Sequence, residues 1–587
     1  MDAVIDPGLW VAMQFAWSPE APAFLLVHYG INTLLLGAPL RTLWIVVARA
    51  FGAYHPAHYR TWPRLPWRSL VRVWSSIKQW HERTFVMGKR ATGGFSGSLA
   101  TLAQLYKPSQ LLLGRATAFG VGLLQPVGTK VDTHAFMYAM TGAGKTVQLI
   151  SIIRCWRGSV FVIDPKAQIT NGLFRHDTRR WHVLDPYGIS DAPSACFNAF
   201  DCIKDAVRRS GESSAVLWAN RIAEALIQTP TGTKSPYFPN TARGFLVGLI
   251  LHVLSRHPEH EHNLPFVRDL IVHGNRIFEN GQELTLGDEA HALLLDTMRT
   301  SPAYDGAVAG GAAPLASAGD ETAGNVRSTL QEQTKWLDLP AVRAITRSSS
   351  FALSTLKEDD QDVVSLCAPV FSIRQELAPF CRLLTNMTAY TFEAVPKKKG
   401  QCLTVIDELP SQGHNETIEV MLAVARSYGQ TFLGVAQNVE LMKLAYPKSW
   451  GTFTGEAKAV YWMATNHDET ARHLSQVLGK KTIVEKDRYS GRKSYREVDV
   501  KTPDQVKRYL APESGNLIVT GAGLRPRRLK AEPYFKALPV WMYAADRDHR
   551  EALLRRITRA LFVRTPSEPS QQTASTDSST PSQEESS

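Results

Sequence analysis

The stretch AFMYAMTGAGKTVQLISIIR, residues 135–154, decides the fold of this chain. Its first six residues are apolar and predict a buried strand, and VQLISIIR has the apolar spacing of a helix. Between them, Ala139, Gly144, Lys145 and Thr146 form a phosphate-binding signature: a small residue, four spacers and Gly-Lys-Thr. Ala139 replaces the more usual first glycine. A loop of this kind between a strand and a helix predicts an α/β fold that binds a nucleotide.

Each residue type in this loop has a chemical reason. Gly142 and Gly144 allow the backbone to curl so that its N–H groups point at phosphates, and the following helix presents its positive N-terminus to the same anion. Lys145 would contact the β- and γ-phosphates, and the Thr146 hydroxyl would ligate Mg²⁺. ATP and Mg²⁺ are therefore the predicted cofactors. The predicted nucleotide-binding residues are Ala139, Met140, Thr141, Gly142, Ala143, Gly144, Lys145 and Thr146.

A second apolar run, CLTVIDELP (402–410), ends in two adjacent carboxylates. Asp407 would orient Mg²⁺ through a water molecule, and Glu408 would polarise the attacking water for hydrolysis. The next apolar run, TFLGVAQ (431–437), ends in Gln437, which would sense the γ-phosphate or position water. Arg426 precedes that run and would reach a phosphate in the next subunit of a ring. From local sequence alone, Gln437 is as readily a loop residue, and Arg426 a surface arginine.

Seven short apolar runs, rich in β-branched and aromatic residues, predict strands that are covered on both faces. Helical patterns separate most of them, so we expect a mostly parallel, doubly wound sheet. The runs are AFMYAM (135–140), SVFVID (159–164), WHVLD (181–185), LTVID (403–407), TFLGVAQ (431–437), AVYWMA (459–464) and NLIVT (516–520).

One region departs from this alternation of strands and helices. Between 204 and 335 the chain has amphipathic helical runs such as SAVLWANRIAEALIQT and no convincing strand, which predicts an inserted all-α domain. Within it we expect GAVAGGAAPLASAGD (306–320) to be a small-residue loop. The ATPase domain would then comprise 86–203 and 336–564. The acidic tail 565–587 has almost no apolar residue and is expected to be disordered.

Residues 1–85 are expected to form a membrane-anchor and basic juxtamembrane region. Ala21 to Leu40 carries no charged residue and is just long enough to cross a bilayer. Acidic residues precede it and arginines follow it, an asymmetry that would keep the bulk of the protein on the cytoplasmic side. The alternative is a buried hydrophobic hairpin in a soluble protein.

The chain is strongly basic, with a formal net charge of +12 and a pI near 9.3. Such an excess favours polyanionic partners, either nucleic acid or an anionic membrane face, over a merely basic cytosolic enzyme. None of the six cysteines has a CxxC spacing, which indicates reduced thiols rather than a zinc or redox site.

With these elements in order, the chain resembles the type IV coupling proteins, the TraG/TraD/VirD family of conjugation and type IV secretion ATPases. SVFVIDPKAQI with RRWHVLDPYG is similar to the family's paired Asp-Pro strands, and VIDELPSQGH to its Asp-Glu motif. GGFSGSLATLAQLYKPSQLLLGRA resembles the family's lead-in to the phosphate-binding loop, and ARSYGQTFLGVAQNVELM and NHDETARHLSQVLGKKT resemble its remaining motifs. Three departures from the family's motifs are mild: Ala139 replaces the first glycine, Ala199 stands where proline is common, and Gln412 stands where leucine is usual.

The resemblance implies a RecA-like motor domain, an all-α insertion, an N-terminal anchor in the bacterial inner membrane and a homo-hexamer around a channel. It implies that Gln437 and Arg426 belong to the nucleotide site. The implied function is to deliver a relaxase-bound DNA strand, or protein effectors, to a type IV secretion channel. Two alternatives stay open: a double-stranded DNA translocase of the FtsK/HerA type, and a membrane adaptor that uses nucleotide only as a switch.

Overall fold

The computed structural model describes residues 110–118, 123–130, 133–229, 236–276, 278–279, 282–283, 287–359, 361–396, 401–486, 493–538 and 540–544. The predicted anchor region 1–85 and the predicted acidic tail 565–587 lie outside these residues. Among the helices that the structure describes, none combines the length and the apolar character needed to cross a membrane.

In the described chain, eleven strands form one sheet in the order β2-β1-β15-β14-β11-β3-β10-β9-β4-β8-β5. The strands from β11 to β5 pair in parallel, and β14, β15, β1 and β2 extend one side with antiparallel pairings. Their bounds are β1 Leu111–Ala118, β2 Leu123–Thr129, β3 His134–Tyr138, β4 Val160–Asp164, β5 Arg180–Leu184, β8 Asp362–Cys367, β9 Cys402–Ile406, β10 Gln430–Ala436, β11 Ala459–Trp462, β14 Asn516–Gly521 and β15 Leu524–Lys530.

All seven predicted strands are present, and the mostly parallel α/β fold is confirmed. The strands β8, β1, β2 and β15 were not predicted. Strand β15 reads LRPRRLK, and such a charged stretch carries no local signal of a strand. It becomes one because β1 and β14 pair with it on either side.

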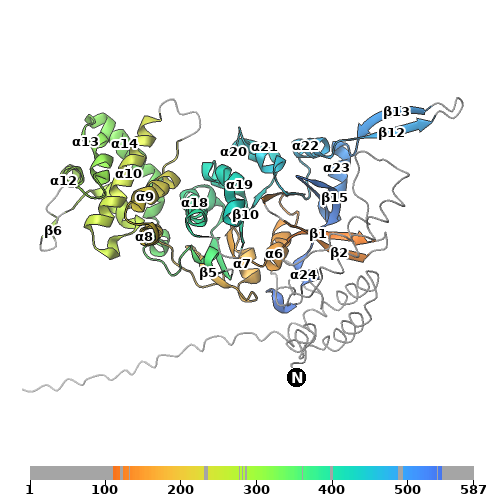
Figure 1. The fold of residues 1–587 in the computed structure, drawn as a ribbon, viewed down its shortest axis with the longest axis horizontal. Helices are drawn as coiled ribbons and strands as arrows, with labels where there is room; N and C mark the ends of the chain where they lie inside the picture. The colour runs from red at the N-terminus through yellow and green to blue at the C-terminus, as the bar shows by residue number, and fades with distance from the viewer. Residues whose placement is uncertain are drawn as a thin grey trace, which may run out of the picture.

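The central strands are continuously apolar because helices cover both of their faces (Figure 1). In β3, Ala135 and Met137 pack into one hydrophobic cluster, whereas Phe136 and Tyr138 pack into another on the opposite face. Strand β11 alternates in the same way, and its Trp462 ring stacks on Tyr138 with the ring centroids 4.8 Å apart. Alternating side chains of one strand therefore fill two separate cores.

The helices around the sheet contribute to three hydrophobic clusters. Helices α6, α7 and α24 belong to the first cluster and α19 to α23 to the second, whereas α16 to α18 belong to a third that also includes the helices between β5 and β8. The bounds are α6 Lys145–Cys155, α7 Gln168–Leu173, α16 Thr355–Glu358, α17 Val370–Arg374, α18 Ala378–Ala394, η4 Leu409–Gln412, α19 Glu416–Tyr428, α20 Val439–Ala445, α21 Trp450–Gly455, α22 Asp468–Leu478, α23 Pro503–Tyr509, η5 Pro512–Ser514, α24 Tyr534–Ala537 and η6 Val540–Met542.

Between β5 and β8 the chain leaves the sheet and forms a helical lobe at one end of the molecule, on the left in Figure 1. Its described strands, β6 and β7, have two residues each and pair only with one another. The boundaries 204 and 335 of an inserted domain stay a prediction. The elements are α8 Ala199–Ser210, α9 Ser214–Leu226, α10 Tyr237–Arg256, η2 Glu259–Glu261, α11 Leu264–His273, β6 Phe278–Glu279, β7 Gln282–Glu283, α12 Gly287–Arg299, α13 Ala307–Ala316, α14 Asp320–Thr334, η3 Lys335–Asp338 and α15 Pro340–Thr346.

The expectation of a loop over 306–320 is wrong, because residues Ala307–Ala316 form helix α13. Glycine and proline lower the local tendency to form a helix, which explains the error. The same small residues allow close packing against α10. A Cβ atom on Gly311 would lie 2.8 Å from the backbone of Gly244 and of Gly248. Tertiary packing therefore outweighs local propensity here.

The crowded core around β10 leaves room only for glycine at position 434, in the middle of that strand. A Cβ atom there would lie 2.7 Å from Cε2 of Phe136 and 2.9 Å from Cε1 of Phe432, and β10 is buried throughout. We expect Gly434→Ala to lower the melting temperature, since overpacking a core costs on the order of 1–3 kcal/mol. Gly324→Ala is the matched control, because Gly324 lies in α14 and a Cβ atom on it would meet nothing within 4 Å. Equal melting temperatures for the two variants would contradict the crowding argument.

Candidate nucleotide site

The candidate site lies where β3, β10 and β9 end. Strand β10 pairs in parallel with both neighbours, so the carboxyl ends of all three strands share one edge of the sheet. The phosphate-binding loop follows β3, the Asp-Glu pair follows β9, and Gln437 follows β10. The loop is tied to this edge by backbone hydrogen bonds from Ala139 N to Ala436 O (3.0 Å) and from Met140 N to Ala464 O (3.2 Å). Sequence reasoning did not identify Ala464, because a backbone acceptor leaves no side-chain signal.

The loop itself has the conformation expected of an anion cradle. Gly142 and Gly144 have φ angles of 80° and 77°, in the left-handed region that favours glycine, and a Cβ atom on either would meet nothing within 4 Å. Their role is therefore conformational. Helix α6 begins directly after Gly144, and no side chain caps its N-terminus. Its first N–H groups are thus available to an anion.

Lys145 joins the loop to the acidic pair. Its Nζ atom lies 3.1 Å from Oδ1 of Asp407 and donates a hydrogen bond to Oε1 of Glu408. Gln437 Nε2 lies 3.1 Å from each carboxylate oxygen of Glu408. The structure therefore brings together four of the five predicted catalytic residues, which come from three separate segments of the sequence.

Burial controls the charges of this cluster. It raises the pKa of Asp407 above its ordinary value, and the positive charge of Lys145 offsets only part of that effect. For Lys145, burial lowers the pKa, but the carboxylates of Asp407 and Glu408 outweigh it, so the pKa lies above its ordinary value. Lys145 is therefore held as a cation against two acidic side chains.

Glu408 has a backbone conformation that is uncommon for a residue with a side chain, with φ 63° and ψ 48°. This conformation reverses the chain between β9 and η4, where Ser411 N donates to Glu408 O at 2.8 Å. It also leaves the Glu408 side chain at the sheet edge beside Lys145 and Gln437. A strained residue at the end of a central strand is a feature of functional sites.

Arg426 is the predicted catalytic residue that the structure does not bring to this cluster. It is exposed in the last turn of α19, which leads into the amino end of β10. The site lies at the carboxyl end of that strand, roughly 20 Å away at about 3.3 Å per residue. Arg426 therefore does not complete the nucleotide site of its own chain.

The two Asp-Pro motifs that resemble the family stabilise turns at the same edge. Asp164 Oδ2 accepts hydrogen bonds from Thr170 N at 2.8 Å and from Thr170 Oγ1 at 3.0 Å. Asp185 accepts hydrogen bonds from Ile189 N at 3.1 Å and from Ser190 N at 2.6 Å. Both carboxylates thus satisfy backbone N–H groups in the segments that follow β4 and β5.

The sheet and its loop define a P-loop nucleotide-binding protein of the RecA-like type. The chain belongs to the family described as "Type IV secretory system Conjugative DNA transfer", which it matches over residues 100–546. This confirms the resemblance to the type IV coupling proteins.

Individual relatives agree with this assignment. The chain is 26% identical to the conjugal transfer protein TraG of Escherichia coli, with 69% of this chain and 67% of TraG covered. It is 23% identical to protein VirD4 of Rhizobium radiobacter, covering 68% of this chain and 57% of VirD4. The plasmid coupling protein TrwB in complex with ADP and Mg²⁺ has the same fold, with a TM-score of 0.57, 14% identity, and 76% of this chain and 94% of TrwB covered.

The buried Asp164 predicts a pH-dependent stability. Burial raises its pKa from 3.8 to about 6, so its contribution to stability is complete below pH 3.8 and is lost as the pH rises through about 6. Above pH 6 the folded protein must hold a buried anion. We therefore expect Asp164→Asn to raise the melting temperature relative to the parent at pH 7.5, and by less at pH 5.5. A difference in melting temperature that is independent of pH would contradict this.

Proposed function

We propose that this protein is the coupling ATPase of a conjugation or type IV secretion apparatus. The observation that carries the proposal is the convergence of Lys145, Asp407, Glu408 and Gln437 at one edge of the sheet, in a chain of the conjugative DNA transfer family. ATP hydrolysis at this edge would drive DNA, a relaxase–DNA complex or protein effectors into a membrane channel.

Residues 139–146 would hold the phosphates of ATP, and Thr146 with Asp407, the latter through water, would hold Mg²⁺. The fit rests on the left-handed glycines, the uncapped start of α6 and the oxygen donors present. TrwB has been solved with ADP and Mg²⁺ and with a non-hydrolysable ATP analogue, which supports the same ligands here. When bound, Mg²⁺ would neutralise charge on the phosphates.

The protein's own groups divide the work of hydrolysis. Lys145 would stabilise negative charge on the transferred phosphoryl group. Glu408 would accept a proton from the attacking water, and Gln437, which contacts both oxygens of Glu408, would orient that carboxylate and the water.

The assembly and location of the protein belong to the same proposal. We infer a homo-hexamer at the bacterial inner membrane, anchored by its N-terminal region, with the bulk of each subunit on the cytoplasmic side. The family match favours this function over an FtsK/HerA-type translocase. Glu408 beside Lys145 favours hydrolysis over an adaptor that uses nucleotide only as a switch.

Two variants should separate nucleotide binding from hydrolysis. Lys145→Ala removes the cation that contacts phosphate, so we expect loss of both ATP binding and hydrolysis. Glu408→Gln keeps the size of the side chain but cannot accept a proton, so it should bind ATP and fail to hydrolyse it. Fluorescent-nucleotide titration and phosphate release measure the two steps. Lys448→Ala, at an exposed lysine in the loop between α20 and α21, is the control for loss of a lysine. Hydrolysis at the parental rate by Glu408→Gln would contradict its role.

Arg426 should act on the site of the neighbouring subunit, because it lies at the wrong edge of the sheet to serve its own. Arg426→Ala should bind ATP but not hydrolyse it, since an arginine supplied across an interface contributes on the order of a thousandfold in rate. Mixing it with Lys145→Ala should restore activity, because some interfaces then pair an intact loop with an intact arginine. ATPase titration of one variant against the other measures this.

The control for that experiment is a mixture of Lys145→Ala with Glu408→Gln. Both residues lie in one site of one subunit, so no interface in the mixed ring is complete and no activity should return. If the Arg426→Ala mixture is equally inactive while rings form, Arg426 does not act between subunits.

A further inference from the structure

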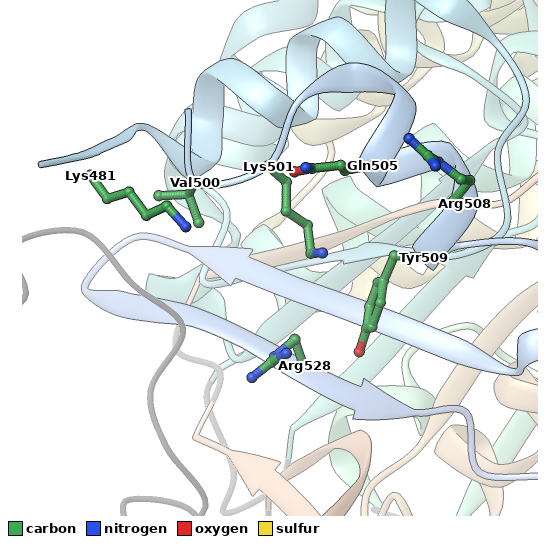
Figure 2. Close-up of a pocket in the computed structure, with 7 residues that line it drawn as sticks. All are labelled: Lys481, Val500, Lys501, Gln505, Arg508, Tyr509 and Arg528. Atoms are coloured by element: carbon green, nitrogen blue, oxygen red, sulfur yellow. The ribbon is translucent and has the colours of Figure 1, made fainter. Parts of the chain in front are cut away.

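A cationic pocket lies well away from the candidate nucleotide site, beside the hairpin of β12 (Lys480–Lys486) and β13 (Lys493–Asp499). Its volume is about 690 Å³. Figure 2 shows side chains from the hairpin, from α23 and from β15 around it. Lining residues are Lys481, Val500, Lys501, Gln505, Arg508, Tyr509 and Arg528.

The composition of this pocket is one-sided. Four of its seven lining residues are cationic and none is acidic. The Lys501 ammonium lies over the ring of Tyr509, 4.8 Å from its centroid. Burial lowers the pKa of Lys501, and the neighbouring charges of Arg528 and Lys481 lower it further. A pocket lined by four cations and no carboxylate attracts an anionic ligand.

The pocket is connected to the nucleotide loop by short, ordered elements. Ala464, which accepts a hydrogen bond from Met140 of the loop, is followed by α22, and α22 leads directly into β12. Ser475 Oγ of α22 donates to Lys501 O at 2.7 Å, and Asp468 of α22 forms an ion pair with Lys507 of α23. The cations thus lie on elements that α22 joins to Ala464, the residue that contacts the loop.

The cations extend beyond the pocket along the hairpin, which projects from the molecule (Figure 1). Arg496 in β13 is exposed and pairs with Ile483, two residues beyond Lys481, so it lies on the same face of the hairpin as Lys481. A compact phosphate would need only the pocket, whereas cations that continue along one face of the hairpin suit a linear polyanion. A two-stranded ribbon exposed in this way gains stability when a partner covers it.

We propose that this pocket and the β12–β13 hairpin bind the sugar-phosphate backbone of a single nucleic-acid strand. Lys481, Lys501, Arg508 and Arg528 contact phosphates, and Arg496 contacts the strand where it continues along the hairpin. The inference rests on the proposed function, since it assigns the surface through which the motor holds its DNA. It assigns a second binding surface outside the nucleotide site. Helix α22 connects this surface to the phosphate-binding loop.

The test is binding of a fluorescent single-stranded oligonucleotide to the full-length protein over a range of salt concentrations, without ATP. Lys501→Gln/Arg528→Gln should weaken binding about tenfold or more and reduce the slope of log affinity against log salt by roughly one to two. Arg508→Gln, a milder change, should act in the same direction. Melting temperatures identify any variant that fails to fold.

The matched control is Arg472→Gln/Arg525→Gln, which removes the same charge. Arg472 lies on α22 with a 62% exposed side chain, and Arg525 is exposed near the start of β15. Oligonucleotide binding should then stay within about twofold of the parent, since neither residue lines the pocket and only a diffuse charge effect remains.

Parental affinity and slope in the pocket variant would overturn the proposal. So would a loss of binding confined to phosphatidylglycerol vesicles or to inorganic phosphate, measured in parallel. These outcomes are independent of the motor itself, because the motor proposal fails only if Lys145→Ala still hydrolyses ATP.

Discussion

The structure depends on one constraint: strand β10 lies between β3 and β9 and pairs in parallel with both. Because the pairing is parallel, the carboxyl ends of the three strands lie at one edge of the sheet, although the strands are far apart in the sequence. The phosphate-binding loop, the Asp-Glu pair and Gln437 therefore meet without any direct covalent connection. Gly434 permits this arrangement, because the ring of Phe136 from β3 occupies the space that a side chain would need.

The charged side chains at this edge destabilise the fold but prepare the site for catalysis. Burying the Asp407 carboxylate beside Lys145 costs desolvation that their ion pair offsets only in part, so the pKa of Asp407 lies above its ordinary value. The strained backbone of Glu408 adds to that cost. In return, a cation and a carboxylate are held in place before a nucleotide arrives, so little reorganisation is left for the reaction.

Around this site the chain adds two projections at opposite ends of the sheet, the helical lobe and the β12–β13 hairpin (Figure 1). The lobe leaves after β5 and returns at β8, so it is attached to the outer parallel strands. The hairpin is attached through α22 to the strand whose end contacts the phosphate-binding loop.

The sequence by itself determined seven of the eleven strands described in the sheet, the phosphate-binding loop, the Asp-Glu pair and the family, because burial on two faces and phosphate chemistry both leave local patterns. It did not show that Ala307–Ala316 is a helix or that LRPRRLK is a strand, since small residues and charges give no such local signal. Only the tertiary structure decided that Gln437 contacts Glu408, that Arg426 lies at the far edge, and that four cations gather beside Tyr509. Those facts depend on which segments, far apart in the sequence, pack together in the fold. The residues next to each segment in the sequence do not reveal this packing.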